Sequence, residues 1–470
     1  MNEMVVAETT FQPQPETWTA EDPARGGAFA SARRATRDAM DLDPGQTIIA
    51  TGHQASIWHP GILAKDLAIS ALAARSASGG VTTRAIHFIA DHDANDGGLI
   101  AYPSPGPTRS HWRMLPGTDG KATGDRPAAP PSSPPTDAIQ INGVAEGMEA
   151  IHAAVAAHAD APNLAWQLGL ATETLAAPFA RDVPRRSMTG LLQMPIGLEL
   201  IDRMVGDPKA CIEAHDAALE AERRTRAKTS GRLPQAVARP LRRGSTEELP
   251  LWRATPEGRR PVLRGELIDP AECRPRALLA TALARLGGCD LFVHGLGGGI
   301  YDPAMEDWIK RWLGDDVVNE LAPAPLATAT LRLPIPVDGL TETLEATPEG
   351  LHRMLSDPDL GRTDAPRREM LLASIDQATR RSQDRRSAFD ALRREIELAR
   401  SRGRDAIDRY RGRLAAESKK RHLRDVAADR TWAFPLHDLD ALRGLAAEVD
   451  ASFADRPEDQ IQPSPNGRGR

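Results

Sequence analysis

The sequence has few cysteines and few aromatic residues, and it has no long apolar run. Its three cysteines, Cys211, Cys273 and Cys289, form no CxxC pair and lack metal-ligand spacing, which argues against a disulfide framework or a zinc ribbon. Aromatic residues make up only 4% of the chain, so alanine and leucine must fill much of the interior, which suits long helices. No apolar stretch reaches the roughly eighteen residues of a membrane span, and the acidic N-terminus does not look like a signal peptide. We therefore expect a cytoplasmic protein with no membrane partner.

Excess positive charge is also absent. The net charge is -6 and the isoelectric point about 6.1, which gives no overall attraction to nucleic acid. The basic segment 400–424 has no interleaved aromatic residues, so it is better explained as a solvated helix face. No nucleic-acid partner is expected, and any site for an anion must be local.

At 470 residues the chain exceeds what one core usually supports, so two or three cooperating units are expected. Composition and pattern divide it into successive segments. These are a lead and helix at 1–45, a first core part with a proline-rich insertion at 46–143, a mainly helical connecting region at 144–274, a second core part at 275–362, a charged coiled coil or helical hairpin at 363–454, and a disordered tail at 455–470.

Short β-branched runs alternate with helical patterns from Gln46 onward. Residues 46–50 (QTIIA) and 84–90 (RAIHFIA) are predicted strands, and residues 61–80 form the crossover helix between them. This order predicts a parallel sheet. The pattern returns late, with a strand at 289–294 (CDLFVH), a helix at 302–313 and a strand starting at 326. We predict an α/β fold with a Rossmann-like parallel sheet, which is discontinuous in sequence if the late strands join the early ones.

Two regions interrupt or follow this core. Residues 102–137 are so rich in proline that we predict a surface insertion without regular structure. Farther on, apolar residues from Leu371 to Ala399 recur at spacings of four and three, with polar interruptions. Gly403 or Gly412 could break this helix, and an antiparallel helical hairpin or a dimerising coiled coil would explain the pattern. The predicted macromolecular partner is a second copy of the chain.

Polar residues and glycines follow three of the predicted strands. Ligands of parallel sheets bind outside the carboxyl ends of the strands, so these residues are candidates for one common site. They are Thr51, Gly52, His53 and Gln54 after the first strand, Asp91, His92 and Asp93 after the second, and His294, Gly295, Gly297, Gly298 and Tyr301 after the third.

The first of these segments suits an anion. His53, Gln54 and His59 are predicted to lie in a loop before a helix whose N-terminal amides favour negative charge. Lys65, one turn into that helix, would add a point charge, although the chain lacks a GxxxxGK[ST] motif.

The second segment has two interpretations. Asp91 and Asp93 could hold a magnesium ion together with a substrate phosphate, or Asp93 and Asp96 could cap turns. His92 could then satisfy a neighbouring backbone group. His87, inside the predicted strand, is expected to be a core histidine, and Trp58 is expected to pack beneath the loop.

The third segment predicts a tight strand-to-helix turn in which Asp302 and Pro303 start the helix. Glycines there allow a phosphate to approach the backbone. Because Ile300 replaces the third glycine of GxGxxG, the segment is only weak support for a dinucleotide.

These motifs resemble a known family. TGHQASIWHPGILAKD (51–66) followed by HFIADHDANDGG (87–98) is similar to the TGQQ-type and EDHD-type loops of the bacillithiol-biosynthesis cysteine-adding enzymes, and HGLGGGIYD (294–302) to their glycine-rich turn with Tyr301 as its aromatic. The resemblance implies a Rossmann-type core related to nucleotidylyltransferases, inserted connecting segments, a dimerising C-terminal coiled coil, and a ligase that attaches cysteine to glucosaminyl malate. The chain departs from the family where His53 replaces glutamine and where Gly298 and Gly299 replace an acidic residue. Residues 59–61 (HPG) are closer to the histidine-glycine loops of nucleotidylyltransferases.

Three functions therefore remain open. The first is a ligase that joins cysteine or a similar amine to an anionic or nucleotide-linked small molecule. In it, His53, His59 and Lys65 would stabilise developing charge, and Asp91 or Asp93 would bind magnesium or act as the base. The second is a nucleotidylyltransferase that releases pyrophosphate. The third is a non-catalytic nucleotide-binding assembly protein. A nucleotide and magnesium are the candidate cofactors.

Overall fold

The structure, a computed structural model, describes residues 7–22, 24–43, 45–105, 109–138, 141, 143–228, 232–233, 237, 239–335, 346–356 and 366–454. The chain forms two compact units. One comprises residues 1–334 and 429–470, and the other residues 335–428. The predicted tail at 455–470 lies outside the described residues.

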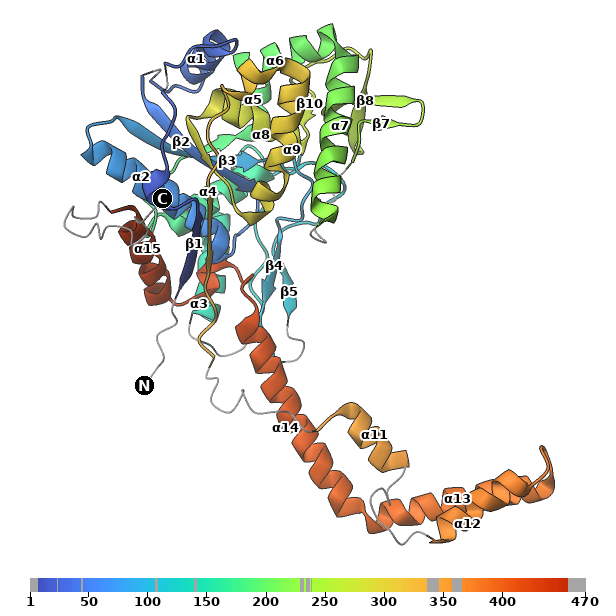
Figure 1. The fold of residues 1–470 in the computed structure, drawn as a ribbon. Helices are drawn as coiled ribbons and strands as arrows, with labels where there is room; N and C mark the ends of the chain where they lie inside the picture. Colours follow the sequence, from blue (N-terminus) through green and yellow to red (C-terminus); the bar gives the residue numbers. More distant parts are fainter. Residues whose placement is uncertain are drawn as a thin grey trace, which may run out of the picture. The chain divides into compact units, whose positions relative to one another are not determined.

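A four-stranded parallel sheet forms the centre of the first unit (Figure 1). Its strand order is β11 (Leu291–Val293), β2 (Thr47–Gln54), β3 (Thr83–Ala90) and β6 (Arg185–Ser187). The late strand β11 pairs directly with β2, which confirms that the sheet is discontinuous in sequence. The α/β class with a parallel sheet is thus confirmed.

Both faces of this sheet are buried, as the apolar strand sequences require. Successive side chains of a strand point to opposite faces. Accordingly, Ile48 and Phe292 belong to one apolar cluster and Ile49 and Val293 to another. The helices that contribute to the first cluster include α1 (Ala30–Ala39), α5 (Met188–Leu192), α6 (Pro195–Gly206), α7 (Pro208–Ala227), α8 (Ala277–Leu283) and α9 (Leu296–Leu313), and those of the second include α2 (Pro60–Ser78) and α15 (Leu439–Phe453).

Helix α2 is the crossover between β2 and β3, as predicted. His59 is its N-cap and Pro60 its first residue, where the missing amide hydrogen costs nothing. Strand β2 is longer than predicted, however. It pairs with β3 as far as Gln54 opposite Ala90, so His53 and Gln54 are strand residues and not part of a loop.

Helix α9 also differs from the prediction. It begins at Leu296, directly after Gly295, so the glycines form its first turn and Pro303 lies inside it. Close packing explains why glycines occupy this helical turn. A Cβ atom at Gly298 would lie 2.2 Å from Nδ1 of His294, and one at Gly299 would lie 2.6 Å from the Leu326 side chain.

The region 144–274 was predicted to be mainly helical, and its second half is not. Helices α3 (Val144–Ala157), α4 (Leu164–Ala176), α5, α6 and α7 are followed by an antiparallel sheet of β7 (Arg242–Arg243), β8 (Thr246–Thr255), β9 (Gly258–Leu263) and β10 (Cys273–Pro275). The sequence did not predict this sheet, because its strands carry many charged residues in place of an alternating apolar pattern. In the structure these residues pair between neighbouring segments, as Arg253 does with Glu272 and Arg242 with Glu247.

The proline-rich insertion is not free of regular structure either. Within and beside it, β4 (Leu99–Tyr102) and β5 (Ser110–Arg113) form an antiparallel pair. Trp112, Met114 and Leu115 are buried, and this apolar packing stabilises a segment that proline content alone predicts to be irregular. The predicted late strand is β12 (Leu326–Thr330), which pairs with β1 (Glu8–Gln12) and meets the parallel sheet through a parallel bridge between Leu326 and His294.

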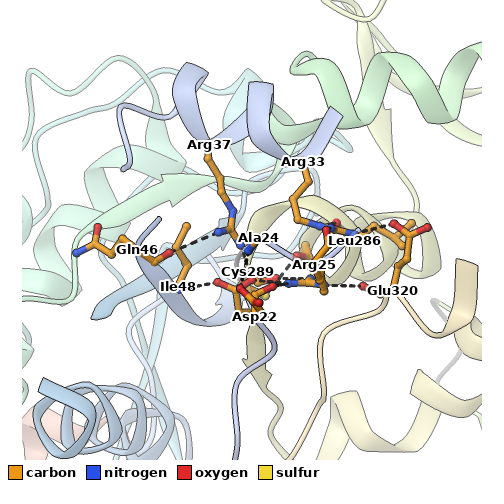
Figure 2. A network of polar contacts seen from close by, with 12 residues as sticks. Asp22, Ala24, Arg25, Arg33, Arg37, Gln46, Ile48, Leu286, Cys289 and Glu320 are labelled. Carbon is orange, nitrogen blue, oxygen red and sulfur yellow. Dashed lines mark hydrogen bonds and ion pairs between the residues drawn. The ribbon is translucent and has the colours of Figure 1, made fainter. Parts of the chain in front are cut away.

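Charged residues fix the amino edge of the sheet (Figure 2). Asp290, just before β11, accepts hydrogen bonds from Arg25, from Arg37 and from the backbone N–H of Ile48. Arg33 donates to Glu320 at 2.8 Å. Arg33 and Arg37 lie one turn apart on α1, so this helix is tied to the sheet through two buried carboxylates.

The second unit contains α11 (Pro348–Ser356), α12 (Pro366–Gln377), α13 (Gln383–Arg402) and α14 (Arg404–Ala428). Gly403 separates α13 from α14, as predicted. The predicted continuous seam is wrong, because the chain turns between Gln377 and Gln383 and α12 packs along α13 (Figure 1). Helix α15, which the predicted segment 363–454 included, belongs to the first unit. In the part of the chain that the structure describes, none of the helices has the length and apolar character needed to span a lipid bilayer.

Candidate functional site

The three candidate segments meet at the carboxyl edge of the parallel sheet. Thr51 lies opposite Val293 of β11, and Gln54 lies opposite Ala90 of β3, so the residues that follow these strands are neighbours. We call residues 51–54, 91–93 and 294–298 the rim. The expectation that they share one edge is confirmed, whereas the roles of the individual residues remain predictions.

A hydrogen bond joins two of the rim segments. Nε2 of Gln54 donates to Oδ2 of Asp93 at 2.8 Å; the glutamine is exposed and the aspartate partly exposed. A partly exposed carboxylate that is held by a neutral amide remains available to a ligand. These two residues are therefore the best placed of the predicted polar residues.

Asp91 has a structural role instead. It is buried, and its two oxygens accept hydrogen bonds from Oγ of Ser187 at 2.5 Å and from the backbone N–H of Thr189 at 2.8 Å. Both donors belong to the start of α5, so Asp91 anchors that helix to the end of β3. These two hydrogen bonds fit a structural anchor better than the predicted role of Asp91 as magnesium ligand or base.

His92 and the proposed metal site can be judged together. The His92 side chain is buried, and Nε2 lies 3.8 Å from Oδ1 of Asp93. Within the described ranges, no group of three or more His, Cys, Asp or Glu residues is placed to hold a metal ion. With Asp91 engaged by Ser187 and Thr189, Asp93 is the carboxylate of the rim that is left for a metal ion, and the magnesium site stays a prediction to which we assign no step.

The two histidines around the β2–α2 connection are uncharged at neutral pH. Burial lowers the pKa of His53 well below its usual value, and the nearby Lys65 lowers it further. Burial also lowers the pKa of His59 to about 4, and its Nδ1 accepts a hydrogen bond from the backbone N–H of Gly61 at 3.1 Å. The predicted contact of these imidazoles with an anion stays a prediction, and it would be made without a positive charge on either ring. Hydrogen bonding by neutral imidazoles remains open to them.

Lys65 lies behind the rim rather than on it. Its side chain is only 2% exposed, and Nζ donates to the carbonyl of Gly52 at 2.5 Å. Burial lowers the pKa of Lys65 to about 8. A Cβ atom at Gly295 would be 3.6 Å from Cδ of Lys65, so the lysine runs beneath the ends of β2 and β11.

His87 is a core histidine, as predicted. It is fully buried, its Nδ1 lies 2.7 Å from Oδ1 of Asp66, and Oδ2 of Asp66 accepts from Arg185 at 2.9 Å. Trp58 stacks on the His87 ring with centroids 4.5 Å apart, which confirms that it packs beneath the rim. The cluster of His87, Asp66 and Arg185 thus lies in the interior behind the rim and holds α2 against β3 and β6.

A second buried cluster follows β11. Nε2 of His294 lies 3.2 Å from Oδ1 of Asp302, and Oδ2 of Asp302 accepts from Arg285 at 2.7 Å. Burial would raise the pKa of Asp302, but His294 and Arg285 outweigh it and hold the pKa below its usual value. Asp302 was predicted to cap a helix and instead pairs with these two residues. Burial raises the pKa of Tyr301, beside the His294 ring, to about 12.

Thr51 does not face a ligand. It is fully buried, and Oγ1 donates to the carbonyl of Val293 at 2.7 Å, which ties β2 to β11. Gly297, in contrast, has nothing within 4 Å of where a Cβ atom would lie. The first turn of α9 is thus open on this side.

Sequence reasoning missed several residues near the rim. Ser187 and Thr189 hold Asp91 in place, Arg285 holds Asp302 beside His294, and Arg259 donates from Nη1 to the carbonyl of His92 at 2.7 Å. Arg259 comes from β9, in a region that the sequence pattern placed outside the core. No motif around it signals this contact.

One surface hollow of the described residues, about 240 Å³, lies away from the rim. It is lined by residues of the second half of α2 and of α15, together with Phe179 and Arg181. The rim residues do not line it.

Comparison with known proteins adds no assignment: the sequence matches no protein-family model and no curated protein at a significant level.

Proposed function

We propose that this protein is a condensing enzyme of the ligase class, which joins an amine such as cysteine to an anionic or nucleotide-linked small molecule at the rim. One observation carries the proposal. Three segments that are far apart in sequence place Gln54, Asp93 and the open start of α9 at one edge of a parallel sheet. This edge is where α/β sheets bind their ligands.

Helix orientation supports an anionic substrate. Helices α2 and α9 both begin at this edge, so their positive N-terminal ends face it. Gly297 leaves the backbone of α9 accessible, and the buried Lys65 adds positive charge behind the strand ends. A carboxylate or phosphate at the rim would be stabilised by these groups.

The chemical roles follow from the charge states. An ammonium must lose its proton before its nitrogen attacks the carboxyl carbon of the second substrate, and Asp93 is the partly exposed carboxylate that could accept that proton. The C–N bond forms as the bond from that carbon to its leaving oxygen breaks, and the oxygen departs as phosphate when ATP has activated the carboxyl group. His53, uncharged at neutral pH, would supply a hydrogen bond to charge that develops on the substrate. The bacillithiol-type resemblance agrees with this reaction class, and a Rossmann-like ancestry of the sheet is part of the same proposal.

Substitution of His53 tests the proposal. Purified protein would be incubated with cysteine and glucosaminyl malate, with and without ATP, and products would be identified by mass spectrometry. His53→Ala should keep the fold and lower turnover roughly a hundredfold or more, whereas His111→Ala, at an exposed position of β5, should leave it unchanged. Equal turnover in wild type and His53→Ala would contradict the assigned role, and the absence of any product with any amine would contradict the ligase class.

A second candidate is nucleotidyl transfer. His59 caps α2 directly beyond β2, and the neutral His53 lies at the end of the same strand. Histidines near the start of a helix can donate hydrogen bonds to the phosphates of a nucleoside triphosphate. Release of pyrophosphate from a nucleotide without formation of an amine adduct would favour this reaction over ligation.

We also propose that the second unit mediates self-association, as the coiled-coil resemblance implies. Met370, Phe389 and Leu398 on α12 and α13 are large apolar residues that are 69%, 43% and 57% exposed. A second copy of the chain would cover them. Light scattering should give a dimer mass for wild type and a monomer mass for Phe389→Glu. A monomeric wild type would contradict the proposal, and a stable dimer without enzymatic activity would favour the assembly role.

A further inference from the structure

Of the residues that the sequence indicated, Lys65 alone brings positive charge to the rim, and it does so from behind the strand ends. His53 and His59 are uncharged at neutral pH, and Lys65 is buried beneath the strand with its ammonium on the carbonyl of Gly52. A guanidinium from another part of the fold reaches the same place. It belongs to Arg259, the second residue of β9.

Arg259 is held against the end of β3. Its Nη1 donates to the carbonyl of His92 at 2.7 Å, and its Cζ lies 4.9 Å from the ring centre of Trp252. The guanidinium has five N–H donors, and within the described residues the hydrogen bond to His92 is the one that they make. Asp93 and Asp125 are close enough to raise the pKa of Arg259 against the larger lowering effect of burial, yet neither forms an ion pair with it in the described part of the chain.

Other arginines of the same antiparallel region have carboxylate partners. Arg260 pairs with Glu266, Arg253 with Glu272, and Arg264 with Glu247. Arg259 is half-buried and lacks such a partner within the described ranges. Partial burial of a guanidinium without a counter-ion lowers the stability of the folded protein, and a bound anion would offset this loss.

Trp252 fixes where this guanidinium points. Arg276 and Arg239 also lie over its ring, at 4.3 and 5.2 Å from its centre. Both pair with Glu248, at 3.0 and 2.8 Å. The indole and its two paired arginines therefore form a rigid wall, and Arg259 extends from that wall toward the rim.

We infer that Arg259 binds an oxyanion of the substrate, a carboxylate or a phosphate, at the carboxyl edge of the sheet. The planar guanidinium can donate two parallel hydrogen bonds to such a group while Nη1 keeps its contact with His92. Asp93, on the same side, then lies beside the bound group rather than on the arginine. The inference rests on the proposed use of the rim as the substrate site and names the residue that selects for a negatively charged ligand.

Anion binding tests this inference without need of turnover. Isothermal titration calorimetry at constant ionic strength would measure the Kd of pyrophosphate and of citrate for wild type, Arg259→Gln, Arg259→Lys and Arg260→Gln. Arg260 is the matched control because it neighbours Arg259 but is exposed and paired with Glu266. We expect Arg259→Gln to raise Kd roughly tenfold to a hundredfold and Arg260→Gln to leave it within about twofold.

The outcomes separate the inference from the proposed function. Tighter binding of pyrophosphate would identify a phosphate site, and tighter binding of citrate a carboxylate site. Arg259→Lys keeps the charge but loses the paired donors, so its Kd should lie between those of wild type and Arg259→Gln. Unchanged binding in Arg259→Gln, or no binding of either anion to wild type, would overturn the inference. Binding that depends on Arg259 in a protein without ligase activity would retain the inference and reject the proposed function.

Discussion

Gln54 donates a hydrogen bond of 2.8 Å to Asp93 across the ends of two neighbouring strands. The two residues are 39 positions apart, and the parallel register of β2 and β3 brings them together. The amide holds the carboxylate without neutralising it, because it carries no charge. Asp93 therefore stays partly exposed at the edge of the sheet that the ligand is proposed to occupy.

Asp93→Asn should lower turnover by roughly a hundredfold or more if this carboxylate accepts the proton of the amine. The folded state should change little, because the side chain is partly exposed and asparagine can still accept from Gln54. We expect the free energy of unfolding to change by less than about 1 kcal/mol. Product formation measured by mass spectrometry, together with urea unfolding, checks both values.

Asp96→Asn is the control for this variant. Asp96 is similarly exposed and pairs with Arg113 at 2.7 Å outside the rim. Its replacement should leave turnover unchanged. Equal losses in the two variants would mean that the effect reflects general charge removal and not the position of Asp93.

The parallel sheet and the shared edge could be predicted because they depend on local signals. The apolar run before Thr51, the helix pattern after His59 and the run before Asp91 are read from neighbouring residues, and chain topology then places their ends together. Burial could not be predicted in this way. Thr51 and Asp91 have the same chemistry as ligand-binding residues, yet both are buried and bonded to other segments.

Contacts made by residues from distant segments could not be predicted either, because they also depend on tertiary packing. Arg259 reaches His92 over a separation of 167 positions, and the strand that carries it has a polar sequence. Asp302 looked like a helix cap because proline follows it, but packing of Gly298 on His294 starts α9 earlier and turns Asp302 toward Arg285. Contacts of this kind are set by tertiary packing and leave no local pattern.

Gly298→Ala should destabilise the protein, because its Cβ atom would lie 2.2 Å from Nδ1 of the buried His294. Crowding of this size typically costs about 1 to 3 kcal/mol. Gly297→Ala, one residue earlier in the same helical turn, has open space around the new atom and should stabilise by about 0.5 to 1 kcal/mol. Thermal unfolding of the two variants should shift in opposite directions. A shift of the same sign in both would contradict the proposed packing of His294.

Asp290→Asn should destabilise the amino edge strongly. Asp290 is fully buried and accepts from Arg25 and Arg37, so loss of its charge leaves two guanidinium groups without their carboxylate (Figure 2). Removal of one partner from such a pair typically costs about 3 to 5 kcal/mol. Asp22→Asn removes the charge of an exposed side chain, and asparagine can still accept from the Ala24 backbone N–H, so this change should cost less than about 1 kcal/mol. Urea unfolding measures the free energy of unfolding of both variants. If Asp290→Asn lost as little stability as the Asp22→Asn control, a stabilising role of Asp290 would be contradicted.

Stability should fall as the pH is lowered from about 6.5 to 4, because several buried histidines, His87 and His437 among them, remain uncharged in the folded state. Burial lowers the pKa of His87 and of His437 to about 4, whereas an unfolded histidine has a pKa near 6.5. Between these two pH values the unfolded chain binds protons that the folded chain does not. Each of these histidines therefore lowers the free energy of unfolding by about 1.4 kcal/mol for each pH unit of acidification. Asp66 does not contribute in this window, because its folded pKa lies below its unfolded value and its stabilisation is lost only at lower pH. Urea unfolding at several pH values should therefore show a shallower slope for His437→Gln than for wild type. An unchanged slope would mean that His437 is already protonated in the folded protein.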